Sequence, residues 1–171
     1  VLVIGTYDEN GTPNAMNAAW GGVSEENEIT ICVDSEHKTA ENLLARKAFT
    51  VSMATANTLV ACDYVGVVSG NTVADKFARA GFHATKSAFV DAPLIDELPM
   101  SLECEVLSYD TDTCRLVGRV VNVSADESIL DENGKIDAAK LQPITYDTVT
   151  HTYRVLGETV GRAFHDGLAL K

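Results

Sequence analysis

The sequence has no long apolar run and few positive charges. None of its hydrophobic stretches approaches the roughly 20 residues that a membrane-spanning helix needs. Lys and Arg number 13 against 25 Asp and Glu, which gives a formal charge of −12 at pH 7. Nucleic acids and anionic membranes both select clustered cations, so this charge argues against either as a partner. We therefore predict a soluble protein that binds neither nucleic acid nor membrane.

Cysteines are also few, and they stand far apart. There are four, at Cys32, Cys62, Cys104 and Cys114, with no C-x-x-C pair and no Cys/His spacing typical of a metal site. This spacing argues against a redox disulfide or an iron–sulfur cluster. Cys32, Cys104 and Cys114 lie in apolar, strand-like segments, and we expect reduced, buried thiols in a cytoplasmic protein.

Motifs for catalysis by side chains are missing as well. The sequence contains no G-x-S-x-G, no phosphate-binding P-loop, no G-x-G-x-x-G and no H-E-x-x-H. Its four histidines are scattered, and each is more typical of a surface or hydrogen-bonding residue than of a general base. A protein without such chemistry of its own fits a carrier of a cofactor.

What is present is an ordinary globular composition, with 46% hydrophobic and 22% charged residues, over a length that suits one domain, residues 1–171. Residues 24–28 are polar and are predicted to form a turn. The sequence begins at Val1 inside an apolar run, so we expect the first strand to be truncated at that end. Strands dominate without regular strand–helix alternation, which predicts a mainly β fold with inserted helices, most simply an antiparallel barrel. The predicted strands are residues 1–6, 13–20, 29–33, 49–54, 100–109, 114–123 and 152–155, and the predicted helices are residues 40–48, 57–65 and 73–80.

The segment from Asn14 to Trp20 combines small residues with two amides on a predicted strand that leaves a tight turn. Small side chains let a planar ligand approach the backbone, whose N–H and C=O groups can bond to ring heteroatoms. A polar edge strand without a ligand explains the same residues equally well.

A second segment, from Ser35 to Asn42, opens a predicted helix. Asp34, Ser35 or Thr39 is expected to cap it. The N–H groups and the positive dipole end of such a helix suit a phosphate, and Lys38 adds a charge. Ordinary capping by a hydroxyl remains the alternative.

A third segment, Asp63 to Gly70, runs toward a second predicted helix that carries Lys76. Lys76 is a candidate for contact with a phosphate or with an anionic ring edge. The alternative is a solvated lysine on a helix face.

Four motifs occur in order over essentially the whole chain: N-A-M-N-A-A-W at 14–20, H-K-T-x-x-N at 37–42, S-G-x-x-x-x-D-K-F at 69–77 and L-G-E-T-V-G at 156–161. Together they resemble the flavin reductase-like family, and in particular its flavoredoxin branch. The resemblance implies a split β-barrel that binds FMN non-covalently, as a homodimer with the cofactors near the subunit interface. Many relatives carry Thr or Ser at the position of Asn17, whose amide both donates and accepts hydrogen bonds.

The resemblance also implies roles for individual residues. Asn14, Ala15, Met16, Asn17 and Ala18 would line the isoalloxazine ring, and Trp20 would pack close to it. Ser35, Lys38, Thr39 and Asn42 would serve the phosphate and ribityl end. Ser69, Gly70 and Lys76 would complete the pocket, with Tyr146 as a further aromatic candidate.

These residues lead to an FMN-dependent oxidoreductase as the main hypothesis. The flavin would accept electrons from NAD(P)H or from a protein donor and pass them to flavin, iron or another protein. One alternative is a flavoredoxin-like electron carrier with no small-molecule substrate site of its own. Another is a split-barrel module that binds a different small ligand or none.

Overall fold

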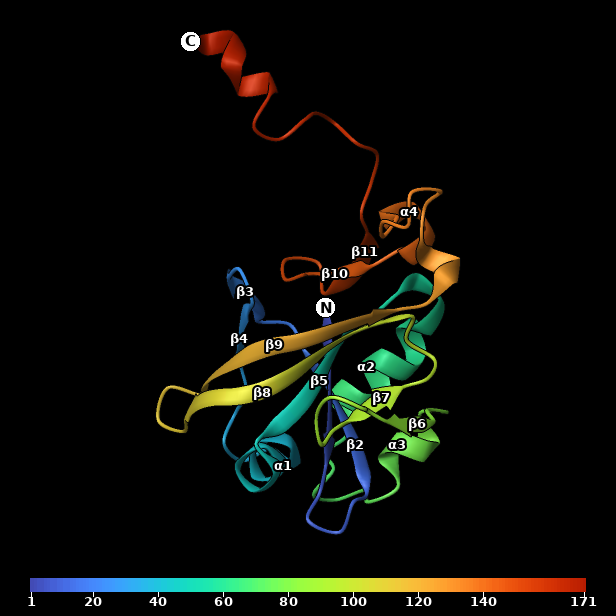
Figure 1. Ribbon diagram of the computed structural model, residues 1–171. Helices are drawn as coiled ribbons and strands as arrows, with labels where there is room; N and C mark the ends of the chain where they lie inside the picture. Colours follow the sequence, from blue (N-terminus) through green and yellow to red (C-terminus); the bar gives the residue numbers. More distant parts are fainter.

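The protein is built around a curled sheet of seven antiparallel strands, which the computed structural model of residues 1–171 shows (Figure 1). The strand order is β2-β1-β5-β8-β9-β4-β3, so the two ends of the sheet are the β1–β2 and β3–β4 hairpins. This confirms the predicted mainly β fold. The strands are β1 (Leu2–Tyr7), β2 (Pro13–Ala18), β3 (Gly21–Glu25), β4 (Glu28–Cys32), β5 (Ala48–Met53), β8 (Met100–Asp110) and β9 (Arg115–Ala125).

Three of the helices and one small sheet lie in the connections between these strands, and the remaining helix and small sheet follow β9. None of the helices is both long enough and apolar enough to cross a lipid bilayer. The helices are α1 (Lys38–Arg46), α2 (Leu59–Val67), α3 (Lys76–Arg79) and α4 (Ala138–Leu141), with short 3₁₀ turns at Ala56–Thr58, Glu127–Ile129 and Asp166–Leu170. The small sheets pair β6 (Ala84–Lys86) with β7 (Pro93–Ile95), and β10 (Ile144–Asp147) with β11 (Thr152–Val155).

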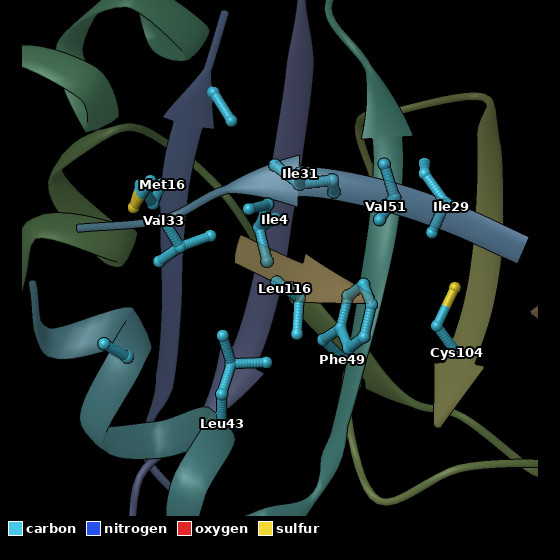
Figure 2. Packing of buried hydrophobic residues seen from close by; sticks show 12 residues of the cluster. Ile4, Met16, Ile29, Ile31, Val33, Leu43, Phe49, Val51, Cys104 and Leu116 are labelled. Atoms are coloured by element: carbon cyan, nitrogen blue, oxygen red, sulfur yellow. The ribbon is translucent and has the colours of Figure 1, made fainter. Parts of the chain in front are cut away.

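One core fills the inside of the curled sheet. Ile4, Phe49 and Leu116 point toward one another from three strands, and Leu43 of α1 closes the cluster (Figure 2). The fit is tight at Gly118 of β9, where an added Cβ would lie 2.3 Å from the Phe49 ring. Strands of this kind are rich in β-branched and aromatic residues because such side chains pack well on a pleated surface.

The opposite face of β1 and β2 forms a second core. Successive residues of a strand point to opposite faces, so Val3 and Ala15 lie here while their neighbours Ile4 and Met16 lie in the first core. Helices α2 and α3 cover this face. Strand β2 is therefore buried on both sides, and it carries the first of the predicted ligand segments.

The start of α1 differs from the prediction. Its N-cap is His37, which makes no side-chain capping bond, rather than Asp34, Ser35 or Thr39. The Asp34 carboxylate instead accepts the N–H of Glu36, at 2.9 Å, in a turn before the helix. Thr39 lies inside the first turn, where its hydroxyl is bonded elsewhere. The predicted cap was wrong because the Asp34 and Thr39 side chains are already engaged and Ser35 makes no capping bond.

Several strands and two thiols also differ from the sequence-based expectations. Strand β3 was not predicted; it shares only its last two residues with the predicted turn at 24–28, and it is exposed along its whole length and therefore lacks an apolar alternation. Strands β6, β7 and β10 were not predicted either. Cys32 is exposed and Cys114 is half-buried, so the expectation of buried thiols was wrong for these two. Cys32 lies on the outer face of the sheet opposite Arg115, and Cys114 lies in the turn before β9.

The segment that follows β11 projects away from the rest of the molecule (Figure 1). Its apolar residues Leu156, Val160, Phe164 and Leu168 recur at every fourth position, and all of them are exposed. Val160 and Phe164 make no burying contact with the chain at all.

Candidate functional site

A cavity of about 700 Å³ lies between β2, α2, the end of β4 and the β10–β11 hairpin. This volume falls within the range usual for small-molecule sites, about 300–1,000 Å³. Most of its lining is apolar. The lining residues are Val1, Met16, Asn17, Ala18, Ala19, Trp20, Cys32, Asp34, His37, Asp63, Gly66, Val67, Cys114, Tyr146, His151 and Tyr153.

A narrower cavity of about 160 Å³ adjoins the first along β2 and α2. The two share five lining residues, so they form one continuous site. The shared residues are Met16, Asn17, His37, Gly66 and Val67, and the narrower cavity adds Lys38, Thr39, Val65, Val68, Ser69, Gly70 and Lys76. The lysines of the site thus lie at its narrow end.

Lys76 has an unusual environment for a lysine, because its side chain is only 4% exposed. Its ammonium donates to the carbonyl oxygens of Val65, at 3.1 Å, and Val68, at 2.9 Å, near the end of α2. Burial lowers the pKa of Lys76 from its ordinary value of 10.5 to about 8, since the charged form loses hydration. No carboxylate pairs with this ammonium. Its charge therefore remains available to an anion in the narrow cavity.

The first turn of α1 supplies the facing wall. Because His37 gives no side-chain cap, the positive end of the helix dipole is not neutralised by an acidic or hydroxyl cap. Lys38 projects from this turn and pairs with Glu41 at 2.7 Å. The hydroxyl of Thr39 accepts a hydrogen bond from the Asn14 amide at 3.1 Å, which links α1 to β2.

Two glycines let the backbone close tightly around the narrow cavity. A Cβ added at Gly70 would lie 2.7 Å from Asn14 Oδ1 and 3.1 Å from Lys38 Cβ. A Cβ at Gly66 would lie 2.8 Å from the Cβ of Asn17. Neither position has room for a larger residue without a shift of the β2 wall.

The β10–β11 hairpin forms an aromatic wall on the wide cavity. The Tyr153 hydroxyl donates to Asp63 Oδ1 at 2.6 Å, and the Tyr146 hydroxyl lies 2.7 Å from His151 Nδ1. Burial, with the neighbouring Asp63 carboxylate, raises the pKa of Tyr153 to about 12. The two tyrosine rings are 5.8 Å apart and inclined to each other by 51°, so the wall offers tilted aromatic surface together with hydroxyl groups.

The structure brings together most of the residues that the resemblance selected. Met16, Asn17, Ala18, Trp20 and Tyr146 line the wide cavity, and Lys38, Thr39, Ser69, Gly70 and Lys76 line the narrow one. Asn14 lies beside the narrow cavity, against Thr39.

Besides Asn14, three of the selected residues line neither cavity. Ala15 is fully buried in the second core, and Ser35 is exposed in the loop before α1. The amide of Asn42 donates to the hydroxyl of Thr6 at 2.9 Å, inside the protein.

Other lining residues were not selected from the sequence. Tyr153 and His151 come from the far end of the chain, and no pattern there pointed to a site. Asp63 and Gly66 lie within a segment that was noticed, but neither was singled out. No three His, Cys, Asp or Glu side chains are grouped in a way that could hold a metal ion.

An open seven-stranded half-barrel with helices in its connections defines a split β-barrel protein, and solved structures share this fold. The chain belongs to the flavin reductase-like family, since residues 1–151 match the family described as "Flavin reductase like domain". Flavoredoxin of Desulfovibrio vulgaris (Miyazaki F) is 32% identical, with 97% of this chain and 91% of that chain covered and a TM-score of 0.91. A flavoredoxin from Methanosarcina acetivorans is 26% identical, with coverage of 100% and 91% and a TM-score of 0.90.

More distant proteins share the fold. An FMN-binding domain of a flavin reductases-like enzyme from Shewanella baltica OS155 is 19% identical, with coverage of 94% and 87% and a TM-score of 0.83. A protein of Aquifex aeolicus (strain VF5) is 31% identical over 108 residues, which is 62% of this chain. The aligned part is 55% of that protein, so this chain matches just over half the length of that relative.

Proposed function

We propose that this protein binds FMN non-covalently and acts as an oxidoreductase that passes electrons through the flavin. The observation that carries the proposal is the pairing of a wide, mostly apolar cavity with a narrow one that holds two lysines. A flavin mononucleotide has the same division, with a planar ring at one end and a phosphate at the other. Membership of the flavin reductase-like family and the FMN-binding neighbour support this choice.

The phosphate belongs at the narrow end in this proposal. Lys38 and Lys76 supply positive charge there, and the uncapped start of α1 supplies N–H groups. Thr39 and Ser69 add hydroxyl donors. In a chain with a formal charge of −12, two lysines at one small cavity are the feature that favours an anion there.

The ring belongs at the wide end, against β2. Met16 and Ala18 offer a flat apolar surface, and the Asn17 amide already donates to the carbonyl oxygen of Cys62 at 3.2 Å, which fixes its orientation. The bound flavin supplies the acceptance and return of electrons. The chain holds the ring, limits the access of water, and places the Tyr146 and Tyr153 hydroxyls on the opposite wall.

The charge of the wide cavity restricts its reactants. Asp34 and Asp63 line this cavity and no Lys or Arg does, so an anionic reactant is repelled there. The part of an electron donor or acceptor that approaches the ring is therefore neutral or cationic. A faster turnover with a neutral quinone than with its sulfonated analogue supports this, and equal rates contradict it.

A second candidate is an electron carrier that docks redox proteins and has no substrate of its own. The acidic surface and the similarity to flavoredoxins favour it. A carrier of this charge associates with a basic partner in a salt-sensitive way. Anaerobic titration with NADH and NADPH separates the enzyme from the carrier. In an enzyme one of these donors reduces the flavin and bleaches its absorbance band, whereas in a carrier neither donor does.

A homodimer in the cytoplasm completes the proposal. The exposed apolar residues of the C-terminal segment, from Leu156 to Leu168, need a surface to cover them, and a second copy of the chain provides one. Four free thiols fit a reducing compartment. Sedimentation of the full chain tests the dimer, and a monomer at all concentrations contradicts it.

The central test is an absorbance spectrum after addition of FMN and removal of the excess. Bands near about 375 and 450 nm that stay with the protein support the proposed site. If the Lys38→Ala variant no longer retains FMN, this result assigns the phosphate to the narrow cavity. A protein that retains no flavin at micromolar concentrations refutes the proposed function.

A further inference from the structure

The fold places two cysteines side by side that are far apart in the sequence. Cys32 is the last residue of β4, and Cys114 directly precedes β9. These strands are antiparallel neighbours in which Cys32 lies opposite Arg115. At the next pair of residues, after Cys32 and before Arg115, the N–H of Val33 donates to the carbonyl oxygen of Cys114 at 2.8 Å. Cys32 and Cys114 are therefore diagonal neighbours across this pair of strands.

This register gives a spacing that a disulfide can span. Opposed residues of antiparallel strands lie about 4.5–5.5 Å apart, and one step along a strand adds about 3.4 Å. The Cα atoms of Cys32 and Cys114 are thus about 6 Å apart, within the range of about 4.4–6.8 Å seen in disulfides.

The backbone conformation of Cys114 changes the direction in which its side chain leaves the strand. In regular strands, diagonal neighbours of this kind point to opposite faces of the sheet. Cys114 has a φ of 57°, in the left-handed region that residues other than glycine seldom adopt, so it departs from the pleat. Both cysteines line the wide cavity.

The other two cysteines are isolated from this pair and from each other. Cys62 and Cys104 are completely buried, one in each core. Burial raises the pKa of both thiols, that of Cys104 to about 12, so neither forms a reactive thiolate. The chain thus has two accessible thiols in one cavity and two inert ones in the interior.

We propose that Cys32 and Cys114 form a reversible disulfide in the wall of the wide cavity, as a two-electron redox centre beside the flavin position. A low-molecular-weight disulfide such as cystamine, whose two ammonium groups suit the acidic lining of the wide cavity, oxidises the pair. One S–S bond forms between Cys32 and Cys114, the S–S bond of the oxidant breaks, and the two thiol protons pass to its sulfur atoms.

The return step couples the pair to the cofactor, and it rests on the proposed function. The Cys32–Cys114 bond would accept two electrons from a bound, reduced flavin and take up two protons, which would break the bond and regenerate both thiols. The substrate class assigned to the wide cavity is therefore a disulfide, carried by the chain itself and replenished by exchange with a disulfide from solution.

The first experiment treats the full chain with cystamine in the absence of flavin. The mass should fall by two hydrogen atoms, and the thiols alkylated after unfolding should fall from four to two. Peptide mapping should show a Cys32–Cys114 cross-link. Cys32→Ser and Cys114→Ser should each lose the cross-link and gain one cysteamine at the remaining cysteine, while Cys62→Ala should retain the cross-link.

Several results overturn the inference. These are a mass gain of two cysteamines on the unsubstituted chain, a cross-link that includes Cys62 or Cys104, or four free thiols after treatment. Each shows that Cys32 and Cys114 do not bridge, and none of them depends on flavin.

A second experiment separates this inference from the proposed function. The FMN-loaded, oxidised protein is reduced by light under anaerobic conditions, and its 450 nm band and free thiols are followed together. We expect the band to recover in the dark as two thiols appear, and a band that stays bleached with the disulfide intact refutes the coupling. If the disulfide forms but the protein does not retain FMN, the inference about Cys32 and Cys114 is supported and the proposed function is refuted.

Discussion

Lys76 should make the binding of FMN depend on pH between neutral and mildly alkaline conditions. Its ammonium is buried at the narrow cavity, where its pKa is about 8 in the free protein. An anionic phosphate nearby favours the charged lysine and raises that pKa. Binding is therefore linked to protonation of Lys76, and affinity should fall as the pH rises through 8.

The size of the effect follows from the two pKa values. If the bound anion restores the pKa of Lys76 from about 8 to its ordinary 10.5, the dissociation constant rises about tenfold between about pH 7 and about pH 9. The phosphate itself does not contribute, because its second pKa is about 6 and it is dianionic across this range.

The assay is the quenching of FMN fluorescence on titration with the protein, repeated at several pH values at constant ionic strength. Lys76→Met should weaken binding at neutral pH and give a nearly flat pH profile. Lys135→Met, which changes an exposed lysine in a turn after Asp131, is the matched control and should retain the slope. A wild-type profile as flat as that of Lys76→Met would refute the reasoning.

Three further predictions test the fold and the site. Gly118→Ala places a Cβ against the Phe49 ring and should lower the free energy of unfolding by about 1–3 kcal/mol in urea titrations; an unchanged midpoint contradicts the tight fit. Glu41→Gln frees Lys38 from its ion pair and should tighten FMN binding about two- to fivefold at low salt, with the gain lost at high salt. Tyr153→Phe leaves Asp63 without its hydrogen bond and should cost about 1 kcal/mol of stability, whereas no loss in thermal or urea unfolding would show that the bond contributes nothing.

The strands were predictable where local sequence decides the conformation. The segment Ile29 to Val33 is β-branched and apolar, and the Asn10–Gly11 turn is closed by the Asp8 carboxylate, which accepts the N–H groups of Asn10 and Thr12. Gly11 has the positive φ that such a turn requires. Strand β3 escaped prediction because an exposed edge strand imposes no apolar pattern.

The site was only partly predictable, because distant contacts determine which side chains face it. The sequence left open whether Lys76 is solvated, and its burial depends on the carbonyl groups of Val65 and Val68 at the end of α2. The adjacency of Cys32 and Cys114 depends on the register of β4 and β9, which no local spacing reveals. The aromatic wall comes from a hairpin near residue 150, more than a hundred residues from β2.

The order of strands in the sheet has a consequence for how the protein is made. Strand β4 pairs with β9, and the cavity also needs the β10–β11 hairpin, so its two walls come from opposite ends of the chain. A ribosome delivers β2, α1 and α2 long before it delivers Tyr153. Long-range pairing of this kind is slow to form, because the loop between the partners must close first. Under the proposed function, loading of FMN is thus a post-translational step, and a nascent chain that stops short of β11 has no complete pocket to fill.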